Sequence, residues 1–219
     1  MRNNKVKRSL RLLVLGLGLL NGLAAYAQGA GTTLIMETHA AFFSSETKQK
    51  SPLDPQVFLS VPSSIAAVGP QGIRHEAGLR PALISDNPTL PIMDATGKSL
   101  NMTLGSWLSA KGTVILTNQP SGNQKVTLVF SGLKAEGQYS LFENHFDEKP
   151  IGFTPLDGSG TDNSFVADAK GAAVLTMYAS KPLTSDNAVL LVYHSDGKTH
   201  GKSRGSIGLD AHHQLIAKP

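Results

Sequence analysis

The sequence predicts an all-β protein: an antiparallel Greek-key β-sandwich with a proline-rich N-terminal covering segment and one short helix. From Gly112 onward, short segments with alternating apolar and polar residues follow one another, separated by links rich in Gly, Asn, Asp and Ser. Such segments at this spacing are typical of sandwich strands. Before Gly112 the prolines are dense, which favours short extended pieces. We therefore expect three parts, residues 1–27, 28–111 and 112–219.

Residues 1–27 have the order of a secretory signal peptide. Basic residues come first, an apolar run from Leu12 to Leu23 follows, and Ala25-Tyr26-Ala27 gives the A-x-A pattern before a cut at Gln28. The rival interpretation is an uncleaved membrane anchor, but Gly and Asn interrupt the run, which is shorter than the roughly 20 residues of a membrane span. The sequence therefore predicts a periplasmic or secreted protein with no membrane span in the mature chain.

The charge and the absence of cysteine exclude several classes of function. The full chain has a net charge of +4, but residues 1–27 hold five basic residues and no acidic one, which leaves 15 Lys and Arg against 16 Asp and Glu. A nearly neutral mature chain gives no reason to expect nucleic acid as a partner. With no cysteine in the chain, any metal site must use His, carboxylate, Asn or backbone oxygen.

The part from residue 28 to 111 is expected to cover the sandwich rather than to form a domain of its own. Its best strand is residues 56–61, QVFLSV. One helix is expected near residues 104–110, because Thr103 suits the N-cap and apolar residues recur at helical spacing after it. Gly112 favours the end of that helix. Seven of the chain's twelve prolines lie in this part: Pro52, Pro55, Pro62, Pro70, Pro81, Pro88 and Pro91.

Seven strands are expected in the sandwich. In residues 125–131 every second residue from Val126 to Phe130 is apolar, as in a half-buried strand. The run 188–193 is apolar on both faces, which indicates a central strand covered on both sides, and His194 follows at its end. The expected strands are residues 113–117, 125–131, 138–143, 163–168, 172–179, 188–194 and 214–218.

The clearest candidate site lies in residues 192–216, which hold four of the seven histidines. Neutral imidazole is a good ligand for zinc or copper, and a carboxylate can complete such a site. Two adjacent histidines point to opposite faces of a strand, so at most one of His212 and His213 joins any one site. The candidate ligands in this stretch are His194, Asp196, His200, His212 and His213.

The loop after His194 decides whether the first two histidines meet. If Asp196-Gly197 forms a two-residue hairpin turn, which Asp-Gly favours, His194 pairs with Thr199 and His200 falls on the opposite face. A three-residue loop would instead place His194 directly across from His200. A longer excursion would also bring His200 back over the strand end.

Other candidate residues lie outside this stretch. His145, with Asp147, would join the first cluster if both lie at one end of the sandwich, whereas His39 and His75 are expected at the surface. Asp157 and Asp162 lie in a Gly-rich loop that is a candidate for calcium binding. The loop lacks the ligand spacing of an EF-hand, so a solvated turn is the better interpretation.

Hydrolase chemistry is not favoured. Ser195 follows His194 directly, and adjacent residues of a strand face apart, so the two do not form a nucleophile and base pair.

Residues Trp107 to Pro219 resemble a set of uncharacterised secreted bacterial β-sandwich proteins. The segments that carry this resemblance are YSLFENHF, FTPLDGSGTDNSF, NAVLLVYHSDGKTHG, RGSIG and AHHQLIA. It covers the C-terminal half of the chain and implies a secreted sandwich without implying an activity.

A second resemblance is to the copper/zinc superoxide dismutase sandwich. SGLKAEGQYSLFENHF is similar to the strand that leads to that family's first copper histidines, and LLVYHSDG to the strand that ends in its last copper histidine. Only His194 matches, because Phe142 and Asn144 stand in the places of the H-x-H pair and His145 is one residue out of step. The zinc loop and the disulfide cysteines are missing too. The resemblance therefore implies the fold and not the activity.

Two functions follow as expectations. The first is an exported, non-enzymatic binding or structural module whose ligand and partners the sequence does not identify. The alternative is a His-based copper or zinc protein with a redox role, built from His194, His200 and one of His212 and His213, with His145 as a further candidate. Measuring bound metal separates the two.

Overall fold

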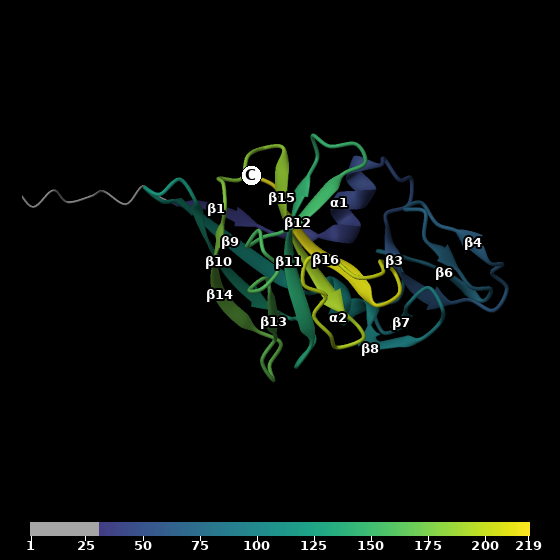
Figure 1. Ribbon diagram of the computed structural model, residues 1–219. Coiled ribbons are helices and arrows are strands. Elements are labelled where there is room, and N and C mark those ends of the chain that lie inside the picture. Colours follow the sequence, from purple (N-terminus) through teal and green to yellow (C-terminus); the bar gives the residue numbers. More distant parts are fainter. Residues whose placement is uncertain (1–30) are drawn as a thin grey trace, which may run out of the picture.

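The computed structural model describes residues 31–219, so the predicted signal peptide lies outside the described residues. The protein is an all-β, sandwich-like fold, as the sequence predicts, and Figure 1 shows its two main sheets at the left and centre. Neither described helix has the length and apolarity needed to cross a bilayer. The Greek-key connection and the domain boundaries stay predictions.

Two antiparallel sheets form the sandwich. The first has the strand order β1 (Thr32–Ile35), β9 (Lys111–Asn118), β10 (Gln124–Ser131) and β14 (Ala173–Ala179). The second has the order β12 (Gly152–Pro155), β11 (Gln138–His145), β15 (Asn187–His194), β16 (Ala211–Ala217) and β2 (Glu37–Thr38), and β13 (Ser164–Val166) also pairs with β11.

The main core lies between these sheets. Strand β10 buries Val126, Leu128 and Phe130 and turns the intervening residues outward, which confirms its predicted alternation. Strand β15 is buried from Ala188 to His194, as expected for a central strand. Its odd-numbered residues face the main core, while its even-numbered residues face a second cluster that includes Phe142.

The proline-rich part contributes one edge strand to each sandwich sheet and forms a further sheet of its own. Strand β1 is an edge strand of the first sandwich sheet, and strand β2 is an edge strand of the second. The remaining strands form a four-stranded sheet in the order β6 (Leu79–Leu83), β3 (Leu53–Ser60), β7 (Pro91–Met93) and β8 (Ser99–Thr103), and a pair of β4 (Ala67–Val68) with β5 (Arg74–His75). Figure 1 shows this material at the right of the sandwich.

Two helices are present, one of which the sequence predicts. Helix α2 (Leu104–Leu108) begins at the predicted cap Thr103, whose hydroxyl accepts a hydrogen bond from the Ser106 amide. Helix α1 (His39–Glu46) is an addition, capped by the Thr38 hydroxyl. The expected surface position of His39 and His75 is wrong, because each side chain is only 5% exposed.

Strand β16 connects the sandwich to the proline-rich part. It pairs with β15 along its length, from Ala211 opposite His194 to Ala217 opposite Val189. A shift in the register leaves Gln214 without a partner on β15. All of β16 is buried, including three consecutive polar residues. Their polar groups must find partners, because an unpaired buried polar group is costly.

The partners of β16 come mainly from β3 and α2. The Gln56 side-chain oxygen accepts a hydrogen bond of 2.6 Å from the His213 amide, and the Gln56 carbonyl accepts one of 3.0 Å from His212 Nδ1. The Gln214 amide donates to the Trp107 carbonyl at 3.0 Å. Trp107 Nε1 in turn donates to Asp54 at 2.8 Å, so these bonds tie α2 and β3 to β16.

Gln56→Ala should therefore cost more stability than an ordinary loop substitution. It leaves the buried His213 amide without an acceptor, which costs about 1–3 kcal/mol of unfolding free energy. Urea unfolding followed by fluorescence measures this. Gln49→Ala is the matched control, because the Gln49 side chain bonds only the hydroxyl of the exposed Thr47; it should change stability by less than about 0.5 kcal/mol. Equal losses would contradict this role of Gln56.

Candidate metal centre

The chain between β15 and β16 is a long loop, residues 195–210, and not a hairpin turn. The favoured two-residue hairpin is therefore wrong: His194 pairs with Ala211 and not with Thr199. A local turn does form, but it is centred on Ser195-Asp196, where the Gly197 amide donates to the His194 carbonyl at 3.2 Å. The loop then continues and returns His200 to the end of β15.

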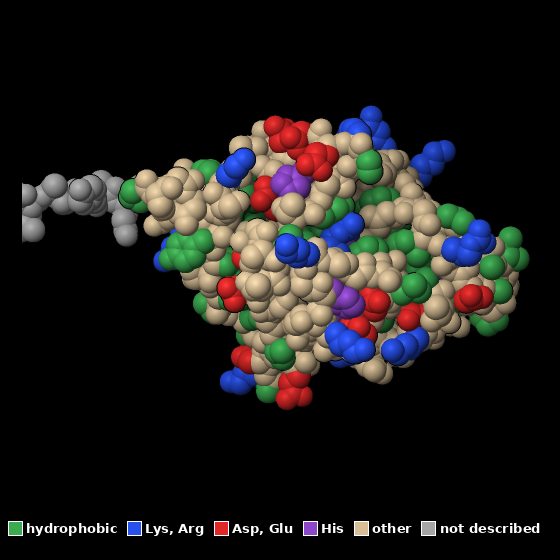
Figure 2. All heavy atoms as spheres, in the orientation of Figure 1, with side chains coloured by type: hydrophobic (Ala, Val, Ile, Leu, Met, Phe, Trp, Pro, Cys, Tyr) green, Lys and Arg blue, Asp and Glu red, His purple; other side chains and the backbone are tan. Residues whose placement is uncertain are grey.

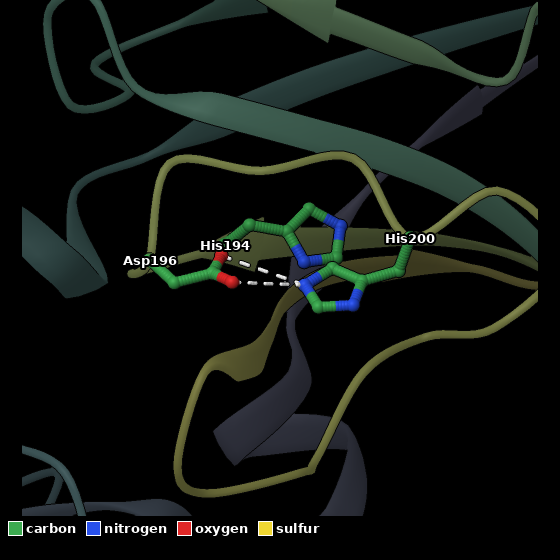
Figure 3. A group of neighbouring side chains, drawn as sticks. All are labelled: His194, Asp196 and His200. Atoms are coloured by element: carbon green, nitrogen blue, oxygen red, sulfur yellow. Dashed lines mark hydrogen bonds and ion pairs between the residues drawn. The ribbon is translucent and has the colours of Figure 1, made fainter.

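Three potential ligands meet at this strand end. His194, Asp196 and His200 each offer one ligand atom, and these atoms lie within 4.8 Å of one another. His200 Nε2 is 3.3 Å from one Asp196 oxygen and 3.4 Å from the other. The two imidazole rings lie side by side with centroids 4.8 Å apart. Figure 3 shows one nitrogen of each ring turned toward the carboxylate.

His194 is held in place with one nitrogen free. Its side chain is 1% exposed, and its Nε2 shares a hydrogen bond of 2.5 Å with the Ser140 hydroxyl on β11. Its Nδ1 is buried and has no hydrogen-bond partner among residues 31–219. Burial, together with the nearby His200, lowers the pKa of His194 to about 4, so the ring is neutral near pH 7 and keeps a lone pair available.

The other two residues reach solvent in part. Partial burial alone would raise the pKa of Asp196, but hydrogen bonds from the Lys198 amide and from His200 lower it below its ordinary value. The carboxylate is therefore ionised at neutral pH. The group thus combines a buried neutral imidazole with an accessible imidazole and an accessible carboxylate, so an ion can enter from the side of Asp196 and His200.

A neighbouring loop supports the position of His200. Gly160 has a φ of +77° and packs so closely on Gly201 that a Cβ at residue 160 would lie 2.7 Å from the Gly201 carbonyl carbon. The buried Asn163 side chain donates to the carbonyls of Leu141, at 3.2 Å, and Gly201, at 3.4 Å. Residues 157–163 therefore hold the loop directly beside His200.

His145 does not belong to this group. It pairs with Asn187 at the far end of β15, and the register separates it from His194 by roughly 23 Å. Both of its ring nitrogens are occupied, by Thr154 at 2.9 Å and by Asn187 at 3.3 Å. The two clusters therefore do not lie at one end of the sandwich.

His212 and His213 also lie outside the group, on opposite faces of β16 as predicted. His212 packs against Trp107 and Tyr193 in the main core. His213 shares the face of His194, but its nitrogens contact Arg204 at 3.0 Å and His39 at 3.4 Å. Of the histidines predicted as ligands, the structure therefore brings together only His194 and His200, with Asp196.

The Gly-rich loop forms the solvated turn that its composition favours. The Asp157 carboxylate accepts hydrogen bonds from the amides of Gly160, Thr161 and Asp162 at 2.9–3.1 Å, and from the Ser159 hydroxyl. Partial burial would raise its pKa, but these bonds, led by that of Ser159, lower it to about 2. Its oxygens are thus engaged by the protein itself.

With this geometry in view, the chain was compared with known proteins. No protein-family model, curated protein or solved structure matches it. Both resemblances seen in the sequence therefore stay predictions, and function has to be argued from the side chains themselves.

The buried histidines predict a loss of stability in acid. Burial lowers the pKa of His39 to about 3 and lowers those of His212 and His213 below the ordinary 6.5. Because the unfolded chain binds protons more readily, each group destabilises the fold as pH falls below about 6.5, by up to about 1.4 kcal/mol per pH unit. The urea midpoint should therefore fall between pH 7 and pH 5.

Asp54 acts in the opposite direction and supplies the control. Burial raises its pKa to about 6, despite hydrogen bonds that lower it. The folded protein therefore binds this proton more readily than the unfolded chain, and the contribution of Asp54 to the unfolding free energy increases as pH falls from about 6 toward 3.8. Asp54→Asn should therefore steepen the acid loss between pH 6 and pH 4, and His39→Asn should flatten it. A midpoint independent of pH between 7 and 5 would show that these histidines are not neutral in the fold.

Proposed function

We propose that the protein binds a divalent zinc or copper ion through His194, Asp196 and His200. The observation that carries this proposal is the Nδ1 of the buried His194, which no atom of the described part of the chain partners. It belongs to a group that also holds a carboxylate and a second imidazole. A buried polar atom without a partner is unusual in native proteins and calls for an explanation. A bound cation supplies the missing partner.

The donor set suits these metals. Two neutral imidazoles and one carboxylate are ligands that zinc accepts with tetrahedral geometry, and copper(II) binds such sites more tightly than zinc does. At metal–ligand distances of about 2.0–2.2 Å, tetrahedral ligand atoms lie roughly 3.4 Å apart. Asp196 and His200 already lie at this separation, so a small shift toward His194 completes the set.

Ser140 would act as the residue that orients His194. A ligating histidine usually donates its other ring N–H to a neighbouring group, which fixes the tautomer and the ring plane. With Nδ1 on the metal, His194 Nε2–H donates to the Ser140 hydroxyl, and the contact observed between these atoms is ready for that bond. Three protein ligands leave one position open, so the ion would remain accessible to water or a small ligand.

We also propose that the protein acts outside the cytoplasm. The support is the order of residues 1–27, with a basic start, an apolar run and the A-x-A pattern. A site built without cysteine suits an oxidising compartment, because imidazole and carboxylate ligands form no disulfides there.

Metal titration of the purified, chelator-treated protein tests the metal proposal. We expect one zinc or copper ion per chain by calorimetry, and a loss of affinity of roughly 100-fold or more in His194→Ala and His200→Ala. His145→Ala is the matched control, since this histidine also lies beside a carboxylate, Glu143 at 3.8 Å, but outside the site; its affinity should equal that of the parent protein.

Ser140→Ala refines the same test. It removes the orienting hydroxyl but no ligand, so zinc affinity should fall roughly 10- to 100-fold while the stoichiometry stays at one. Circular dichroism checks that each variant is folded. Metal binding that is substoichiometric, or that His194→Ala leaves unchanged, would refute the proposed site.

A further inference from the structure

A second concave site lies on the outer face of β16, away from the metal ligands. It has two adjoining lobes, of about 600 Å³ and about 510 Å³, which share Gln71, Ile151, Phe153 and His213. Helix α1 borders the first lobe, and the loop that carries Arg204 borders the second. Each lobe has the volume of a small-molecule site. In Figure 2, green and blue side chains gather in the hollow between the sandwich and the β4 end of the molecule.

Arg204 gives this cleft a positive charge. Its guanidinium lies 3.2 Å above the centre of the Phe153 ring, and its Nη1 is 3.0 Å from His213 Nε2. Within residues 31–219, no carboxylate forms an ion pair with it. A partly buried cation is costly without an anionic partner, and the guanidinium fork matches a carboxylate group.

A chain of hydrogen bonds runs from Arg204 through His213 to His39, whose second ring nitrogen is a donor without a partner among the described residues. Arginine can only donate, so His213 Nε2 accepts, and the proton of the neutral His213 ring is on Nδ1. That Nδ1 lies 3.4 Å from His39 Nε2 and donates to it. The neutral His39 ring therefore carries its proton on Nδ1, which is buried and has no partner within the described chain.

A second buried polar atom without a partner among the described residues belongs to a residue that lines the same cleft. Asn144 lines the first lobe, is 5% exposed, and its side-chain oxygen has no hydrogen-bond partner in the described residues. His39 lines this lobe too. Buried polar groups without partners are rare, and here two of them border one cleft. The same cleft holds an arginine that no carboxylate of residues 31–219 pairs.

The walls of the cleft are aromatic and its rim is basic. Phe42 and Phe146 lie against each other in the first lobe, with ring centres 5.8 Å apart. Lys218 lies over Phe146, with its Nζ 4.7 Å from the ring centre, and Lys149 lines the same lobe. Glu46 is the one acidic residue that lines either lobe within the described chain. The lining thus complements an anion attached to an apolar body.

We propose that this cleft binds a small organic carboxylate. Its anionic group pairs with Arg204, and its apolar or aromatic body packs on Phe153 and Phe146. The site is separate from the metal ligands, so it stands whether or not a metal binds at His194.

Calorimetric titration of the purified full chain with cinnamate tests this proposal. Cinnamate should bind at least tenfold more tightly than cinnamyl alcohol, which has the same ring without the charge, and than inorganic phosphate, which has charge without the ring. Arg204→Met should weaken cinnamate binding at least tenfold. Arg80→Met is the matched control, because Arg80 pairs with Asp86 outside the cleft lining, and it should bind cinnamate as the parent does.

A second variant separates loss of the site from loss of the fold. Arg204→Lys keeps the charge but not the fork, so binding should fall between that of the parent and that of Arg204→Met. Unchanged circular dichroism confirms that each variant is folded. The proposal is overturned if cinnamate does not bind, if the alcohol or phosphate binds as tightly as cinnamate, or if a folded Arg204→Met protein binds cinnamate unchanged.

Discussion

Strand β16 is buried along its whole length although three of its residues are polar, and this constraint shapes much of the molecule. On the side of β16 away from β15, strand β2 pairs only with Leu215 and Ile216. The sandwich therefore offers no partner on that side for the polar residues from His212 to Gln214. Strand β3 therefore brings Gln56 to the open stretch, and α2 brings the Trp107 carbonyl to Gln214. The proline-rich part is bound to the sandwich through these hydrogen bonds as well as through apolar contacts.

The same strand determines where both candidate sites lie. Its first residue, Ala211, pairs with His194 and so closes the loop that returns His200 to the strand end. Its third residue, His213, joins Arg204 of that loop to His39 of α1. One loop thus supplies a proposed metal ligand and, four residues later, the cation of the proposed carboxylate site.

Local pattern predicts the strands well and the long-range contacts poorly. The alternation in β10 and the apolar run in β15 identify their buried faces, because burial there follows from residue type alone. Helix α1 escapes prediction because its apolar residues are adjacent rather than spaced by three or four, and its buried face includes His39 and Ser44. Their burial depends on contacts with β16 and β3, which no local pattern shows.

The candidate metal site was predictable in its ligands but not in its geometry. The residues His194, Asp196 and His200 stand out by type, but the turn that forms is centred on Ser195-Asp196 instead of the expected Asp196-Gly197, and it does not make a hairpin. The segment after it, THGKSRG, offers β15 no apolar partner, whereas AHHQLIA does, so the chain continues to Ala211 before pairing. Ser140 and Arg204 carry no sequence signal, because their roles arise only from the fold.

A crystal structure of the protein grown with zinc, with anomalous data collected at the zinc edge, tests the central claim most directly. We predict one strong anomalous peak about 2.0–2.2 Å from His194 Nδ1, His200 Nε2 and an Asp196 oxygen, with His194 Nε2 still bonded to Ser140. A strong peak elsewhere, or an empty group with His194 Nδ1 bonded to a protein atom or a water, would contradict it.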